Sequence, residues 1–152
     1  MSHAAAGQLE DLKEKIKDVK FGMFTTLDPD GKLCLVREIC AELSVHAQIE
    51  EEILYPAIRQ AVGKEDLVDA AEDEHAEAKA LIRDLCRMQA DDTGMDAAVV
   101  ALAKVVMHHV QEEERDLLTA ARGELAADEL GRRLSQRQEE LLPRVRQQIA
   151  EQ

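Results

Sequence analysis

Aromatic residues are almost missing from this chain, which has two Phe, one Tyr and no Trp among its 152 residues. A β-sandwich or a barrel usually fills its core with aromatic and β-branched side chains. The helix-forming residues Ala, Leu, Glu, Arg and Gln are abundant instead. The composition therefore favours closely packed helices, in a chain long enough for one domain with a buried core.

Cysteines are few, and no long apolar run is present. Cys34, Cys40 and Cys86 are scattered, odd in number and form no CxxC motif, which argues against a disulfide framework or a zinc knuckle and predicts a reduced, cytoplasmic protein. The N-terminus has no basic region followed by an apolar run, so we expect no signal peptide. No stretch of about 18 apolar residues exists, so we expect no membrane-spanning segment.

Basic charge is also scarce, because 19 Lys and Arg stand against 32 Asp and Glu, for a net charge of -13. A nucleic-acid-binding surface needs a basic face, so this balance argues against nucleic acid as a partner. The arginines near the C-terminus alternate with Glu and Gln, which is typical of an exposed helix face.

Helical periodicity dominates from about residue 37 to the end of the chain. We expect four helices, at about residues 37–61, 65–90, 95–122 and 126–149. Pro143 should bend or end the last one. The connections are short, so neighbouring helices should pack antiparallel. The predicted fold is all-α, an antiparallel helix bundle formed by residues 37–152.

Residues 1–36 have a different pattern and are predicted to form a separate N-terminal segment. Apolar residues at helical spacing predict a short amphipathic helix over residues 8–20. Residues 21–36 then predict a β-hairpin around the turn sequence Asp28-Pro29-Asp30-Gly31. A lone hairpin is marginally stable in water, so it must pack on the bundle or stay irregular.

Two stretches of the helical region carry nearly the same pattern. In residues 46–57 and 109–120, a His is followed by Glu at i+4 and i+5, by Leu at i+8 and by Ala at i+11. On a helix, i and i+4 lie on one face about one turn apart. Each copy therefore offers an imidazole beside a carboxylate, which is how helix bundles present ligands to a metal in their core.

The apolar stripes of the predicted helices place both pairs, and a third His, in the core. The rise of 1.5 Å per residue puts them at similar heights in an antiparallel bundle. Buried carboxylates require a compensating cation. A fifth of the chain is Asp or Glu, so one such pair means little, and the prediction depends on the whole set: His46, Glu50, His75, His109 and Glu113.

The neighbouring polar residues have simpler interpretations. His108 lies about 100° round the helix from His109 and is expected to pair with Glu112 at the surface. The other Glu of each acidic run are expected to be solvated. Tyr55-Pro56 is expected to serve packing and a helix kink rather than chemistry.

Residues from about 37 to 145 resemble the bacterial hemerythrin-like, or HHE, cation-binding domain. The resemblance rests on the segments HAQIEEEILYPAIRQ, AAEDEHAEAKALIRDL and VVMHHVQEEERDLLTAAR. It implies a four-helix bundle that holds non-haem iron, one ion or two, and that binds or reacts with oxygen or senses redox state or nitric oxide. By this resemblance the five residues above would be the metal ligands, with a carboxylate bridging two irons.

The resemblance departs from the family at the N-terminus. The family's first helix normally begins with an Asp-His pair whose His is a ligand, whereas residues 9–20 contain no His and His3 lies before them. Residues 9–33 resemble the start of the FMN-binding split-barrel family related to pyridoxamine phosphate oxidase, the general stress protein group. That match is too short to imply flavin binding. The chain therefore looks like a fusion in which a hemerythrin-like domain lost its first helix.

Two functions remain open. The first is an iron protein that binds or senses a small diatomic molecule or redox state. The second is a metal-free helical interaction module, with a groove between the helices at 37–61 and 95–122 filled by the N-terminal helix or by a second chain in a homodimer. No nucleophile triad, phosphate-binding loop or separate pair of catalytic carboxylates is present, so the sequence does not indicate catalytic turnover.

Overall fold

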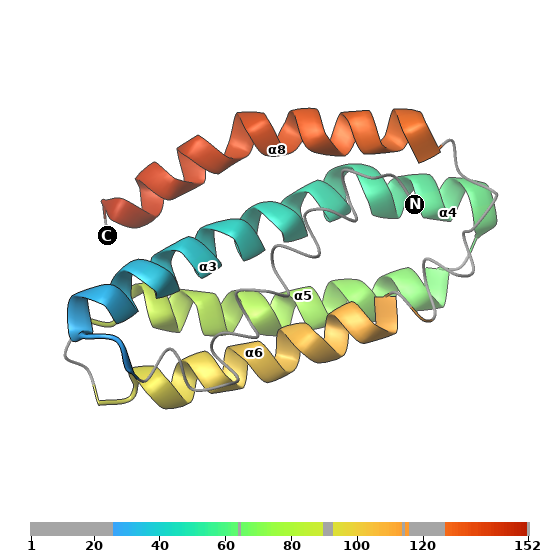
Figure 1. Ribbon diagram of the computed structural model, residues 1–152. Coiled ribbons are helices and arrows are strands. Elements are labelled where there is room, and N and C mark those ends of the chain that lie inside the picture. The colour runs from blue at the N-terminus through green and yellow to red at the C-terminus, as the bar shows by residue number, and fades with distance from the viewer. Residues whose placement is uncertain (1–25, 64, 90–92, 114, 116–126, 152) are drawn as a thin grey trace.

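The computed structural model describes residues 26–63, 65–89, 93–113, 115 and 127–151. Residues 29–62 run in one direction as three consecutive helical elements, and the helices after them alternate in direction (Figure 1). The last helix lies along the first, and the two middle helices lie beside each other. The all-α antiparallel bundle is confirmed, and every regular element within the described ranges is helical. The elements are α3 (Pro29–Ile49), the π-helical turn η1 (Glu50–Leu54), α4 (Tyr55–Val62), α5 (Glu65–Cys86), α6 (Met95–Glu112) and α8 (Ala127–Ala150).

The predicted hairpin is wrong where the structure describes it. Residues 29–36 form the first turns of α3, which crosses the expected boundary between residues 36 and 37 without a break. The supposed turn is a helix start, because the extended Asp28 accepts the Gly31 N–H at 2.7 Å, and Pro29 stands where a helix needs no N–H donor. The helix predicted over residues 8–20 and most of the first strand lie outside the described residues.

The predicted C-terminal ends of the helices at 37–61, 65–90 and 126–149 are close to the observed ends at Val62, Cys86 and Ala150. The predicted end near residue 122 lies outside the described residues. Gly63 follows α4 with a left-handed φ of 69°, a conformation that ends helices and favours glycine. The starts of α5 and α6, at Glu65 and Met95, are as predicted. α8 agrees with the predicted range of 126–149, and it continues through Pro143 to Ala150, so Pro143 does not end it. None of the described helices is both long enough and apolar enough to cross a membrane.

Two groups of buried apolar side chains form the core, one toward each end of the bundle. The first joins α3, α5, α6 and the C-terminal part of α8, and includes Val36, Ile39, Leu85 and Leu102. The second surrounds η1, α4 and the starts of α5 and α8, and includes Ile49, Ile58, Val68 and Leu134. Glu50, His75, His109 and Glu113 are the buried polar residues among those described.

Replacing Asp28 should test the corrected start of α3. Asp28→Ala removes the acceptor of the Gly31 N–H and should lower the free energy of unfolding by about 1 kcal/mol, as is typical of a lost N-cap. Asp28→Asn keeps an acceptor at this position and should be nearly neutral. Urea unfolding followed by circular dichroism measures both, and equal stability of Asp28→Ala and the parent would contradict the cap.

Candidate metal centre

Three helical elements bring four of the predicted ligands together inside the bundle. Glu50 comes from η1, His75 from α5, and His109 and Glu113 from α6 and its C-terminal end. One donor atom of each lies within 4.8 Å of the others, and all four residues are buried. Nε2 of His75 lies 3.1 Å from Oε1 of Glu50 and 3.0 Å from Nε2 of His109. Nε2 of His109 lies 3.0 Å from Oε2 of Glu113.

His46, the fifth predicted ligand, lies at the edge of this group. Its Nε2 is 3.3 Å from Oε1 of Glu50, the carboxylate oxygen that His75 also contacts, and its side chain is 16% exposed. The predicted pairing of His46 with Glu50 along the helix is therefore present. The structure brings all five side chains into one region, with four of them in the tight group, and their role as ligands stays a prediction.

Each buried imidazole meets a second carboxylate on its outer side. Nδ1 of His75 lies 3.2 Å from Oε1 of Glu51, and Nδ1 of His109 lies 2.7 Å from Oε2 of Glu74. The Lys79 ammonium donates to both oxygens of Glu51, at 2.8 and 2.9 Å. An Nδ1–H that donates to a carboxylate leaves the Nε2 lone pair of a neutral imidazole pointing inward, which is the usual arrangement of metal-binding histidines.

These outer carboxylates were not found by the sequence analysis. Glu51 was expected to be only solvated, and Glu74 was not singled out. Glu51 directly follows Glu50, one step round the helix, and faces α5. Only the packing of α3 and α4, the elements on either side of η1, against α5 shows that this direction leads to His75.

Tyr55 belongs to the centre, contrary to the expected packing role. Its buried hydroxyl donates to Oε2 of Glu113 at 3.0 Å and lies 3.1 Å from Nε2 of His75. In an α-helix a residue five positions after Glu50 would point about 140° away from it, so helical spacing did not indicate Tyr55. In η1 the Tyr55 N–H donates to the Glu50 carbonyl, and this wider turn brings both side chains to the centre.

Protons balance the charges of the central group in this structure. Burial disfavours the charge of Glu50, but His46 and the hydrogen bonds with Glu113, His109 and His75 hold its pKa well below the usual range. Burial and the neighbouring charge of Glu50 raise the pKa of Glu113 well above its usual value. Burial would lower the pKa of His109, yet hydrogen bonds to Glu113 and Glu50 raise it to about 11. One carboxyl therefore keeps its proton while the other is ionised.

The donor set fits a divalent transition metal. Two carboxylates with two neutral imidazoles would balance the charge of a 2+ ion. The donor atoms that now share protons would then face the metal. A mixed set of imidazole nitrogens and carboxylate oxygens suits iron as well as zinc, copper and nickel. Among the described residues, no buried side-chain nitrogen or oxygen lacks a hydrogen-bond partner.

A second, more exposed group of donors lies beside the centre. Glu74, His108 and Glu112 place one donor atom each within 4.8 Å of the others. Nε2 of His108 lies 3.0 Å from Oε1 of Glu112, and the His108 side chain is 67% exposed. The prediction that His108 pairs with Glu112 at the surface is confirmed.

Comparison with known proteins identifies the family. The sequence model of the hemerythrin HHE cation binding domain matches residues 3–121, so the chain belongs to this family. The match begins well before residue 37 and includes the segment at residues 9–33. The resemblance of that segment to a split barrel is not supported, and the proposed fusion with a split-barrel segment loses its basis.

The chain is also similar to one solved structure and to one longer protein sequence. The crystal structure of a hemerythrin HHE cation-binding-domain-containing protein from Mycobacterium kansasii is similar to this chain, with a TM-score of 0.75 and 22% sequence identity. The match covers 93% of this chain and 86% of that chain. A DNA nickase from Nostoc sp. is 34% identical over 92 residues, which are 60% of this chain and 26% of the nickase. The chain thus spans about a quarter of the length of that relative.

Removing an outer carboxylate should weaken metal binding without removing a ligand. Glu51→Ala leaves His75 without the acceptor at its Nδ1 and should lower metal affinity by about 10- to 100-fold. Glu52→Ala is the matched control, because Glu52 instead contacts Gln48 and Arg137 at the surface. Competition with a metal chelator measures both affinities. Equal affinities of the two variants would show that Glu51 does not support the centre.

Proposed function

We propose that this protein binds non-haem iron, one ion or two, at the central group of Glu50, His75, His109 and Glu113, with His46 as an additional ligand. The loaded centre then binds a small diatomic molecule, oxygen or nitric oxide, or responds to redox state. The observation that carries the proposal is the convergence of two carboxylates and two imidazoles on one buried point. Such a group requires a cation or shared protons to offset the cost of buried charge.

Iron is favoured over other metals by two features together. The chain belongs to a family of cation-binding domains, and helix bundles with His and Glu ligands on facing helices are a known setting for iron pairs. Donor atoms within 4.8 Å of one another are compatible with a single ion or with two ions about 3.5–4 Å apart that share a carboxylate.

A small ligand has space beside the centre. A cavity of about 30 Å³ is lined by three imidazoles, two charged side chains and otherwise aliphatic residues. The imidazoles are those of His46, His75 and His109, and the charged side chains are those of Glu74 and Lys79. This volume suits a molecule of two or three atoms. The aliphatic lining favours an apolar diatomic molecule over a charged metabolite, which would lose its hydration without new partners.

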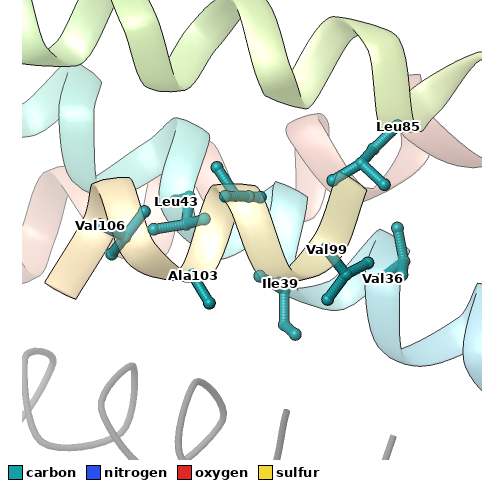
Figure 2. A pocket seen from close by; sticks show the side chains of 8 residues that line it. Val36, Ile39, Leu43, Leu85, Val99, Ala103 and Val106 are labelled. Carbon is teal, nitrogen blue, oxygen red and sulfur yellow. The ribbon is translucent and has the colours of Figure 1, made fainter. Parts of the chain in front are cut away.

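A second, entirely apolar pocket adjoins this cavity between α3, α6 and the end of α5 (Figure 2). It has a volume of about 10 Å³ and shares Leu43 and Val106 with the cavity at the imidazoles. Most of its lining comes from α3 and α6, which correspond to the helices predicted at 37–61 and 95–122. Small side-chain movements at Leu43 and Val106 would connect the two spaces and would give an apolar gas a path toward the centre.

The surrounding residues have definite tasks in this proposal. Bound iron would supply an open coordination position and a change of redox state. Glu51 and Glu74 hold the two imidazoles with their Nε2 atoms directed inward. The Tyr55 hydroxyl places a proton beside Glu113 and His75, where a bound ligand could accept a hydrogen bond. Burial and nearby negative charge raise the pKa of Tyr55 far above its usual value, so this group stays protonated.

Anaerobic titration of the metal-free protein with Fe(II), followed by exposure to air or nitric oxide, tests the function. We expect one or two irons retained per chain and a visible spectrum that changes with the added gas. His109→Ala should lower iron affinity by more than about 100-fold, since it removes a ligand rather than its support. His108→Ala is the matched control, because His108 is the next residue but lies at the surface.

Each outcome of this titration decides a separate point. Retained iron with an unchanged spectrum in both gases would contradict the diatomic ligand while keeping the metal. No retained iron would overturn the proposal and favour a metal-free helical interaction module. In that case His109→Ala should lower the free energy of unfolding, because it removes the proton-bearing partner of the buried Glu50 and Glu113 carboxyl groups.

A further inference from the structure

An open groove lies between α3, α5 and α8, away from the four central polar residues. α5 and α8 both pack against α3 but are not packed closely against each other, which leaves this space between them (Figure 1). The groove has a volume of about 670 Å³, which is the size of a site for a small organic molecule. Its lining comes from α3, from the end of α5 with the three residues after it, and from the C-terminal part of α8.

The charged side chains that line the groove are all arginines. Arg37 comes from α3, Arg83 from the last turn of α5, and Arg87 directly follows that helix. Within the described part of the chain, none of the three forms an ion pair with a carboxylate, although other arginines of the bundle do. Three guanidinium groups from two segments of the chain therefore share one groove without a protein carboxylate to offset their charge.

This local positive charge runs against the composition of the chain. Asp and Glu outnumber Lys and Arg by 32 to 19, and the net charge is -13. A protein of this charge repels anions on average, so an anion that binds the groove does so because of the arginines there. Guanidinium groups hold phosphate and carboxylate groups through paired hydrogen bonds. The groove thus has the charge and the donors of an anion site.

The rest of the lining has both hydrogen-bonding and apolar side chains. The uncharged polar residues are Ser44, Gln48, Gln89 and Gln148. The apolar and sulfur-containing residues are Ile82, Cys86, Met88, Val145 and Ile149. A site with a few polar groups beside an apolar wall is typical of organic ligands rather than of simple inorganic ions. The lining therefore suits a molecule that has an anionic end and an apolar body.

We propose that this groove binds a small organic phosphate, a phosphate monoester with an apolar or aromatic body. The phosphate group binds to the arginines, and the body lies along the apolar wall. Phosphate fits better than a single carboxylate, because a monoester carries a charge of about -1.5 to -2 at pH 7 and three acceptor oxygens, which several guanidinium groups can share. The site uses none of the residues of the metal centre and does not depend on bound iron.

Titration of the full-length, metal-free protein with 1-naphthyl phosphate, in the presence of a chelator, tests the site. We expect saturable binding of one molecule per chain by isothermal titration calorimetry. Because the groove contacts both parts of this probe, its affinity should exceed those of inorganic phosphate and of 1-naphthol by at least about 10-fold. Added salt should weaken the binding of 1-naphthyl phosphate, since the charges of the groove are partly exposed to solvent.

Three single variants test the role of the arginines. Arg37→Gln removes one guanidinium from the groove and should lower the affinity for 1-naphthyl phosphate by at least about 10-fold. Arg37→Lys keeps the charge but loses the paired hydrogen bonds, so its affinity should lie between those of Arg37→Gln and the parent. Arg133→Gln removes the same charge from an exposed position of α8 outside the groove and should bind like the parent. Thermal unfolding should show that all three variants stay folded.

Four results would overturn the proposal. The absence of saturable binding of 1-naphthyl phosphate would exclude the site. Equal effects of Arg37→Gln and Arg133→Gln would show a general response to charge instead of binding in the groove. Equally tight binding of inorganic phosphate or of 1-naphthol would show that only one part of the ligand is recognised. Binding that occurs only after iron is added would assign the phosphate to the metal centre.

Discussion

Four ionisable side chains share one small buried volume in this bundle, and the cost of burying their charges shapes the structure around them. An uncompensated buried charge costs several kcal/mol, which is a large part of the 5–15 kcal/mol that typically separates the folded from the unfolded state. The central group therefore has to be neutral as a whole, either with the protons that Glu113 and His109 hold here or with a cation. Every polar atom in it has a partner.

The surroundings of the centre follow from this requirement. Glu51 and Glu74 orient the two imidazoles, and Lys79 offsets the added negative charge at Glu51. The π-helical turn η1 brings the Tyr55 hydroxyl to the same point as Glu50, which regular α-helical geometry would not do. Apolar core groups lie on either side of the four central polar residues and enclose them. The stability of the metal-free chain thus depends on the same contacts that would surround a bound cation.

Much of the fold and of the centre was accessible from the sequence, because both depend on local periodicity. Helical spacing indicated the interior positions of His75 and of the pairs that start at His46 and His109, and the structure brings their donor atoms together. The start of α3 was misjudged, since Asp28-Pro29 serves equally as a turn and as a helix N-terminus. Only the residues that follow, packed against the bundle, decide between the two.

The sequence by itself determined the helical class of this protein, the approximate ends of its later helices and the candidate ligands, because these follow from spacing along one helix at a time. The tertiary structure decided which side chains support them. Glu74 reaches His109 from another helix, and Tyr55 reaches Glu113 at the end of α6 and His75 on α5. Such contacts join residues far apart in the chain, so no local pattern records them, and only the packing of the helices brings them together.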